Sequence, residues 1–225
     1  MRFFTALLLV FSLFASLASA ELLMTANAFG KGKWLFQGNA LTESNVLNNN
    51  AMQATMLGGA IGYGLTERFD LVARVGLASA TGYPPSLNNL SQSVYGALLK
   101  CQLLDEAVMP VSLAVGVGYY GLSQTVGYVL PSPSTEKYSG AESLFLLEIS
   151  KDYLVFNPYL GLAYRSTNLN SALVSSTQVD VTLGTAFNWT EQSKVLIELT
   201  EQMITPGDQS HYSSGSFALG IQYKT

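Results

Sequence analysis

Residues 57–77 read LGGAIGYGLTERFDLVARVGL, and this stretch decides the fold class. On both sides of Thr66-Glu67-Arg68, large apolar residues alternate with small or charged ones. Successive side chains of a strand point to opposite faces, so the pattern predicts two strands joined by a tight turn. The apolar face ends beside the turn in Tyr63 and Phe69. Aromatic residues at that position are typical of lipid-facing strands at a membrane interface.

The first twenty residues have the features of a secretory signal peptide. Met1-Arg2 gives a positive start, residues 3–17 are apolar, and Ala18-Ser19-Ala20 is a small-residue cleavage site. The apolar run is shorter than the ~20 residues that a spanning helix needs, which disfavours an uncleaved anchor. We therefore predict a signal peptide at 1–20 and one domain at 21–225.

The composition narrows the class of protein further. Charged residues make up 12% of the chain and the mean hydropathy is +0.27, whereas soluble domains are typically ~25% charged. After residue 20, no apolar run reaches the length of a spanning helix. Two solutions remain, a membrane β-barrel and a large soluble β-sandwich.

The net charge and the cysteine count narrow the function. The formal charge of −4 does not indicate the basic surface that nucleic-acid binding requires. The single cysteine, Cys101, excludes an intrachain disulfide and is interpreted as a small apolar filler.

The alternation of 57–77 recurs along the chain and predicts ten strands. After a start at 21–32 that we expect to be mobile, these are 33–42, 52–65, 69–78, 92–103, 109–121, 140–150, 154–165, 177–189, 194–203 and 215–224. The connections alternate between long and short, as they do between the external loops and periplasmic turns of outer-membrane barrels. This arrangement places both termini in the periplasm. The long connections are 43–50, 79–91, 122–139, 166–176 and 204–214.

Charged and aromatic residues fit the same architecture. Charges are excluded from the apolar parity of most strands and should line the lumen, whereas aromatics gather at strand ends as interfacial girdles. The expected lumen charges are Arg74, Lys100, Glu142, Glu148, Arg165, Asp180, Lys194 and Glu198. The expected girdle residues are Trp34, Tyr63, Phe69, Tyr119, Tyr164, Trp189 and Tyr223.

Three phrases carry a resemblance to a known group: GYGLTERFDL (62–71), NPYLGLAYR (157–165) and FALGIQYK (217–224). With the repeated strand pattern, the chain resembles the small OmpA-like outer-membrane β-barrels of Gram-negative bacteria. The resemblance spans residues 21–225 and implies an all-β, closed, up-and-down transmembrane barrel of about ten strands, with eight possible.

Two interpretations of the lumen are open. Its charges could line a path for ions or solutes, or they could pair and plug a barrel that is too narrow for an open channel. Barrels of about eight strands are filled by side chains, whereas wide aqueous channels need about sixteen, so a plugged or narrow lumen is favoured. Since unpaired charges are costly in a dry interior, we expect Arg74 and Lys100 each to pair with a carboxylate.

Two enzyme classes offer alternatives. Omptin-type proteases use Asp pairs with an Asp-His pair, and Asp208 and His211 share a predicted loop, but the spacing is wrong. Lipid A deacylases carry His-x-Ser-Asn near the C-terminus, acting with a nearby Glu. Here His211 and Ser213 match, with Glu201 or Glu198 as the carboxylate, but the Asn is missing. With one histidine, a His-based metal cluster cannot form, and we expect no cofactor and no enzyme activity.

The leading function hypothesis is a structural or surface-interaction scaffold with a narrow or plugged lumen. Its best contact surface is the predicted loop 122–139, with Tyr128, Pro131, Pro133 and Tyr138. The alternatives are a porin-like channel for small solutes, the deacylase-type hydrolase, and an exported soluble lipocalin-like barrel with the two faces inverted. The expected partners are outer-membrane lipid and a surface ligand at the external loops. No nucleic acid is expected, and a monomer is favoured.

Overall fold

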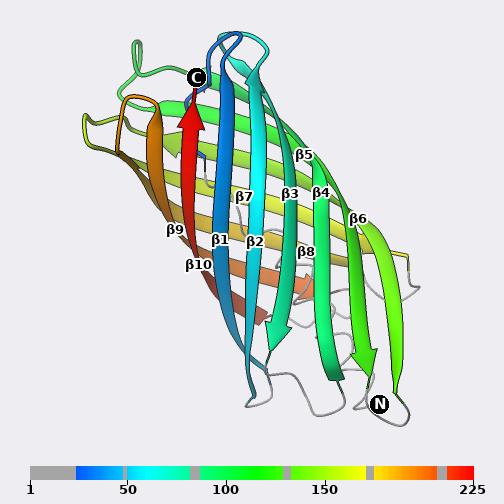
Figure 1. The fold of residues 1–225 in the computed structure, drawn as a ribbon. Helices are drawn as coiled ribbons and strands as arrows, with labels where there is room; N and C mark the ends of the chain where they lie inside the picture. Colours follow the sequence, from blue (N-terminus) through cyan, green and yellow to red (C-terminus); the bar gives the residue numbers. More distant parts are fainter. Residues whose placement is uncertain (1–23, 48–49, 82–86, 129–132, 171–174, 207–211) are drawn as a thin grey trace.

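In the computed structural model, residues 24–47, 50–81, 87–128, 133–170, 175–206 and 212–225 are described. Within these ranges the chain forms ten antiparallel strands closed into one barrel (Figure 1), as predicted. The strands are β1 (Trp34–Leu47), β2 (Asn50–Gly64), β3 (Phe69–Thr81), β4 (Leu87–Leu104), β5 (Ser112–Tyr128), β6 (Ser134–Ser150), β7 (Phe156–Leu169), β8 (Ser175–Asn188), β9 (Ser193–Pro206) and β10 (Tyr212–Lys224). The same residues include no helix long and apolar enough to cross a membrane.

Closure of the sheet depends on the pairing of β1 with β10. Each other pair joins strands that are consecutive in the chain, whereas β1 meets β10 from Leu35 opposite Lys224 to Ser44 opposite Gly215. A closed sheet has no edge with unpaired N–H and C=O groups. The short connections 65–68, 105–111, 151–155 and 189–192 lie at one end of the barrel, which we call the turn end. The opposite end is the loop end.

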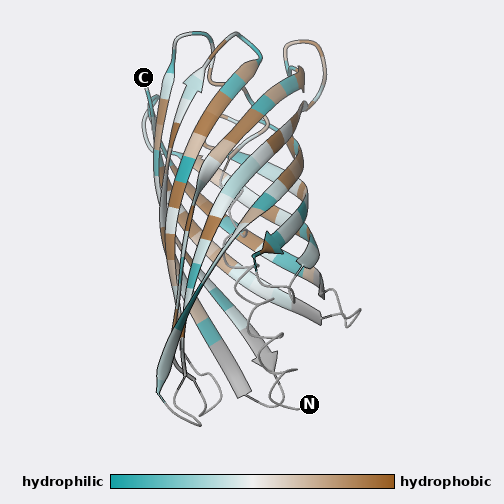
Figure 2. Ribbon diagram, turned by 90° about the vertical axis from the view of Figure 1, so that its right-hand side faces the viewer, coloured by the Kyte–Doolittle hydropathy of each residue, from teal (hydrophilic) through white to brown (hydrophobic). Residues whose placement is uncertain are grey.

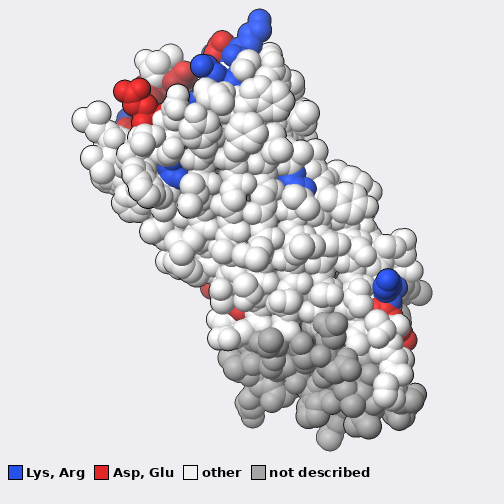
Figure 3. Space-filling view, in the orientation of Figure 1, with Lys and Arg blue, Asp and Glu red and all other residues white. Residues whose placement is uncertain are grey.

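The outer face carries a continuous apolar band that we call the belt. On β3 it runs from Phe69 to Leu77, where the outward residues are apolar and the large ones are 41–65% exposed, and Ser79 follows as the first polar outward residue. Nine strand residues at a tilt of ~40° span about 20 Å across a membrane, close to the ~25 Å typical of such barrels. Hydrophobic and hydrophilic positions alternate along the strands in Figure 2. Most charged atoms visible in Figure 3 gather at the turn end.

The belt decides between the membrane barrel and the soluble alternative. A lipocalin-like barrel would show a charged exterior around an apolar cavity. Here the exterior is predominantly apolar over the turn-end half of the strands, and Lys100, Glu142, Arg165 and Asp180 are buried inside. The soluble barrel therefore does not fit the structure.

The predicted long loops are wrong in extent. β5 runs to Tyr128 and β6 begins at Ser134, so most of 122–139 is a paired hairpin, and β4 begins at Leu87 inside the predicted loop 79–91. The strand ends beyond the belt are rich in Ser, Thr, Gln and Gly. This composition is typical of loops, so it predicts a loop wherever the pairing with a neighbouring strand is unknown. The same extension shortens 43–50, 166–176 and 204–214.

The belt predicts a depth-dependent response to charge. Val75→Arg places a guanidinium in the lipid-facing belt and should lower the free energy of unfolding by about 2–4 kcal/mol. Ser79→Arg, on the same face of β3 beyond the belt, should cost about 0–1 kcal/mol. Urea unfolding of the two variants in phospholipid vesicles measures the difference. Equal losses would contradict the assigned position of the belt.

Candidate functional site: the turn-end mouth and the charged lumen

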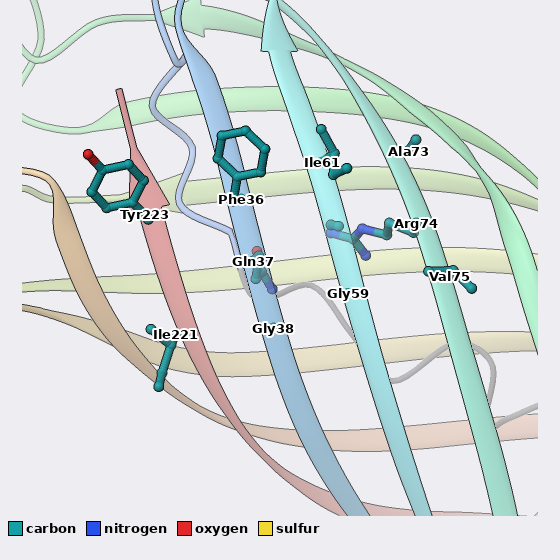
Figure 4. Close-up of a pocket in the computed structure, with 11 residues that line it drawn as sticks. Phe36, Gln37, Gly38, Gly59, Ile61, Ala73, Arg74, Val75, Ile221 and Tyr223 are labelled. Carbon is teal, nitrogen blue, oxygen red and sulfur yellow. The ribbon is translucent and has the colours of Figure 1, made fainter.

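Residues 24–30 of the N-terminal segment 24–33 lie inside the turn-end mouth of the barrel, so the expectation of a mobile start at 21–32 is wrong for residues 24–30. Met24, Ala26 and Phe29 are buried. Met24 and Phe29 belong to an apolar cluster inside the barrel that includes Leu35 and Leu98. In Figure 4 the segment runs behind β1, on the lumen side of the wall. It therefore fills part of the opening that an ion would have to pass.

A buried ion pair of the wall holds the segment by its backbone. Lys100 of β4 lies opposite Asp70 of β3, with 3.5 Å between Nζ and Oδ2, and both side chains are fully buried. Lys100 Nζ donates to the carbonyl oxygens of Thr25 at 3.0 Å and Asn27 at 2.9 Å. The N–H of Phe29 donates to the Asp70 carboxylate at 3.0 Å. The carboxylate partner expected for Lys100 is thus confirmed. The ion pair joins two strands of the wall and also binds the N-terminal segment.

Neutral side chains complete the attachment. The N–H of Ala28 donates to Gln102 Oε1 at 3.0 Å, and the N–H of Ala26 donates to Ser150 Oγ at 3.1 Å. A buried backbone group without a partner is costly, and an irregular segment inside a barrel has no strand neighbour to supply one. The inward side chains of β4 and β6 supply those partners.

Glycines on β2 make room for the segment. A β-carbon at Gly64 would lie 1.9 Å from the carbonyl oxygen of Gly30, and one at Gly62 would lie 2.4 Å from the Phe29 ring. Gly30 and Gly32 have φ angles of 89° and 77°, which glycine adopts without steric cost. The glycines of the GYGLTE phrase therefore permit the close approach of the N-terminal segment.

A second polar cluster crosses β6, β7 and β8 at the loop-end edge of the belt. Arg165 donates from Nε to Asp180 Oδ2 at 2.6 Å and from Nη1 to Glu142 Oε1 at 3.0 Å. Thr167 Oγ1 donates to the other Glu142 oxygen at 3.2 Å. The guanidinium thus lies between two carboxylates, and this geometry ties three neighbouring strands together.

A third group contains two further buried carboxylates, those of Glu198 and Glu148. Tyr159 donates its hydroxyl to Glu198 Oε2 at 2.9 Å, and Thr200 donates to the other Glu198 oxygen at 3.4 Å. Both oxygens of Glu148 are buried without a hydrogen bond among the described residues. Arg74 of β3 is half-buried on the inward parity. These groups make this part of the lumen polar.

A small cavity of about 190 Å³ lies at the turn end between the segment and β9–β10. Lys194, Lys224 and Asp152 contribute to its lining. Asn27 Nδ2 donates to Asp152 Oδ2 at 2.7 Å. Asp152 is in the connection after β6, and burial raises the pKa of its carboxyl while the nearby Lys194 charge opposes that shift.

The structure places the predicted lumen charges as follows. All lie on the inward parity, with Arg74 and Lys194 half-buried and the others buried: Arg74, Lys100, Glu142, Glu148, Arg165, Asp180, Lys194 and Glu198. The carboxylate partner expected for Arg74 stays a prediction. Asp70, Tyr159 and Glu43 are buried in the lumen as well and are not among the predicted lumen charges. Asp70 shares the parity of Arg74, which was the available signal.

The predicted girdle residues lie on the outer face at two levels. The turn-end level contains Trp34, Tyr63, Phe69, Trp189 and Tyr223. Tyr119 and Tyr164 lie further along their strands, where the outward residues change from apolar to polar. Trp34 packs on Tyr63 with 4.7 Å between ring centroids.

The structure describes only part of the hydrolase hypothesis. Glu201 is exposed on the outer face of β9, opposite Gly215, and so faces away from the lumen. Ser213 is part of β10, opposite Met203. His211 and Asp208 lie outside the described residues. Within the described ranges, no group of three or more His, Cys, Asp or Glu side chains is placed to hold a metal ion.

Solved structures with this fold are bacterial outer-membrane β-barrels. The β domain of the Bordetella autotransporter BrkA is 10% identical, with a TM-score of 0.56 over 86% of this chain and 99% of that one. The transport unit of the autotransporter AIDA-I from Escherichia coli is 12% identical, with a TM-score of 0.55 over 95% and 97%. An outer membrane channel from Pseudomonas putida F1 is 9% identical, with a TM-score of 0.53 over 89% and 98%.

At these identities the likeness shows the fold alone, and it confirms the predicted class of fold, that of bacterial outer-membrane β-barrels. No protein-family model matches the chain, and no curated protein matches its sequence.

The Arg165 cluster gives a stability prediction. Arg165→Met removes the shared cation and leaves the Glu142 and Asp180 carboxylates buried side by side. The free energy of unfolding should fall by about 3–5 kcal/mol. The combined variant R165M/E142Q/D180N removes all three charges and should recover most of that loss. Urea unfolding in vesicles compares the two variants, and a combined variant as unstable as the single one would contradict the cluster's role.

Proposed function

We propose that this protein is an outer-membrane β-barrel without enzymatic activity, closed at its turn end by its own N-terminal segment, that acts as a scaffold for surface interactions. The observation that carries the proposal is the attachment of Thr25, Asn27 and Phe29 to the buried Lys100–Asp70 pair. A segment held by charge-assisted bonds in the mouth favours a closed lumen over an open path.

The orientation in the membrane is part of this proposal. A cleaved signal peptide at 1–20 would export the chain, and both ends of the folded barrel, Trp34 and Lys224, lie at the turn end. Short turns and termini face the periplasm in barrels of this class. The loop end would then face the outside of the cell.

The surface for interactions is the polar continuation of the strands beyond the belt. The β5–β6 hairpin extends to Tyr128 and Ser134, and Glu136 and Lys137 of β6 are exposed. The Tyr138 hydroxyl bonds to Glu136. Of the predicted contact residues, Pro133 is exposed and Pro131 lies outside the described ranges. A paired hairpin presents these residues on a more rigid support than a loop would.

A small-solute channel is the second candidate, and one observation favours it. The Glu148 carboxylate is buried inside the barrel, and neither of its oxygens has a hydrogen bond among the described residues. An unsatisfied buried carboxylate is costly unless water or an ion reaches it. A hydrated lumen behind the segment would conduct if the segment left the mouth.

Single-channel recording in planar bilayers separates the two functions. The wild-type barrel, shown to be folded by heat-modifiable gel mobility, should show no discrete openings. The variant K100M/D70N removes both charged groups that hold the segment, so neither is left buried without the other. It should show openings, because the segment is then retained only by neutral contacts.

The control is the variant K151Q/E106Q, which removes a partly exposed ion pair of 3.1 Å at the same end of the barrel. It should remain as silent as the wild type. Reproducible openings from the folded wild type would overturn the scaffold proposal and favour the channel.

A further inference from the structure

The turn-end cavity of about 190 Å³ separates the N-terminal segment from β9 and β10. The hydrogen bonds of residues 25–29 run to the other side of the mouth, to β3, β4, β6 and the connection after β6. Among the residues that the structure describes, none of these bonds reaches β9 or β10. The cavity therefore lies on the side of the segment that the wall does not hold.

Two lysines of the wall line this cavity. Lys194 of β9 and Lys224 at the end of β10 are both half-buried on the inward parity. Lys194 lies directly opposite Gln222, two residues before Lys224, so the two lysine side chains are diagonal neighbours on adjacent strands. Neither ammonium group has an ion pair with a carboxylate of the described ranges. Two like charges that share a cavity repel each other, and an anion between them would remove that repulsion.

The surroundings of the cavity carry an excess of positive charge. The Asp152 carboxylate acts on both Lys194 and Lys224, and the Lys33 ammonium acts on Lys224 as a third cation. The other acidic residue of the lining, Glu191, is exposed in the turn between β8 and β9. Even with Glu191 included, three ammonium groups meet two carboxylates. The electrostatics of the cavity therefore favour an anion.

The cavity is reached from the aqueous side of the turn end and has no contact with lipid. The strand residues of its lining are all on the inward parity, and the others belong to the segment or to the connections 151–155 and 189–192. A volume of about 190 Å³ corresponds to roughly six water molecules. The space fits a group of the size of phosphate or a small carboxylate, and it is too small for a lipid.

We propose that this cavity is a binding site for a small oxyanion, a phosphate or carboxylate group held between Lys194 and Lys224. The side-chain amides of Gln192 and Gln222 also line the cavity and can donate to the remaining oxygens. Bonds between an ammonium and an oxyanion are charge-assisted and strong for their size. The periplasm as the source of the anion rests on the proposed orientation of the barrel.

A bound anion would also secure the closed mouth. Ala28 and Phe29 form the segment side of the cavity, and the two lysines form the wall side. The anion therefore joins the segment to β9 and β10, where the protein supplies no hydrogen bond of its own within the described ranges. This step deepens the proposed closure of the lumen.

Isothermal titration calorimetry of the refolded full chain in detergent tests the site, with inorganic phosphate and acetate as separate probes at constant ionic strength. The folded wild type should bind one anion per barrel, and the tighter of the two probes identifies the preferred group. K194Q/K224Q should weaken binding roughly tenfold for each lysine removed. The control K31Q/K151Q removes two turn-end lysines that do not line the cavity and should bind as the wild type does.

A third variant keeps both lysines and fills the site from within the protein. Gln222→Glu places a carboxylate directly opposite Lys194 and should abolish phosphate binding, because that carboxylate takes the place of the anion. Heat-modifiable gel mobility shows that each variant is folded. A folded wild type that binds neither probe would overturn the site, as would unchanged affinity in K194Q/K224Q or Gln222→Glu.

Amide hydrogen exchange tests whether the anion secures the segment. Phosphate at ten times its dissociation constant should slow the exchange of the Ala28 and Phe29 amides about tenfold in the wild type and leave it unchanged in K194Q/K224Q. Phosphate that binds the wild type without this slowing would overturn the link between segment and wall. Failure of the proposed function is distinguishable: a folded barrel that binds no anion contradicts only this inference, whereas channel openings from the wild type contradict the scaffold proposal.

Discussion

The structure depends on the pairing of β1 with β10, because a sheet can lie in hydrocarbon only when every backbone N–H and C=O has a partner. The register from Leu35–Lys224 to Ser44–Gly215 removes both edges of the sheet at once. Once the sheet is closed, each strand has an outside and an inside of fixed parity. The outside must then match lipid, which accounts for the belt. The inside must accommodate the charges that a sequence of alternating residues places there.

The buried charges of the interior find partners in two ways. Arg165 lies between Glu142 and Asp180 and links three strands of the wall, whereas Lys100 and Asp70 also use their remaining hydrogen-bonding capacity on the backbone of residues 25–29. A buried ion pair is weak support for stability by itself, since the loss of hydration offsets the attraction. Its additional bonds to an irregular segment give it a structural purpose. The wall and the segment that fills its mouth are therefore one polar network.

The barrel was predictable from the sequence, whereas the position of the N-terminal segment inside the mouth was not predicted. The alternation from Phe69 to Leu77 is a local signal of period two, and it survives without knowledge of any partner strand. The polar strand ends, such as Ser134–Ser139, carry no such contrast and were assigned to loops. The place of residues 24–33 depends on side chains far along the chain, such as Ser150, which no local pattern reveals. The glycines at 30, 32, 62 and 64 were a signal that could have been read, because each occupies a position where the backbone approaches closely or turns.

The closed lumen depends on residues 24–30 occupying the mouth of the folded barrel. Amide hydrogen exchange, measured by NMR on the isotopically labelled protein in lipid nanodiscs, tests it most directly. The N–H groups of Ala26, Ala28 and Phe29 donate to Ser150, Gln102 and Asp70, and the account predicts that they exchange orders of magnitude more slowly than in an unstructured peptide. The neighbouring N–H of Lys31, which lies in an exposed turn, serves as the internal reference. Exchange of the three amides at the unprotected rate in a folded barrel would contradict the account.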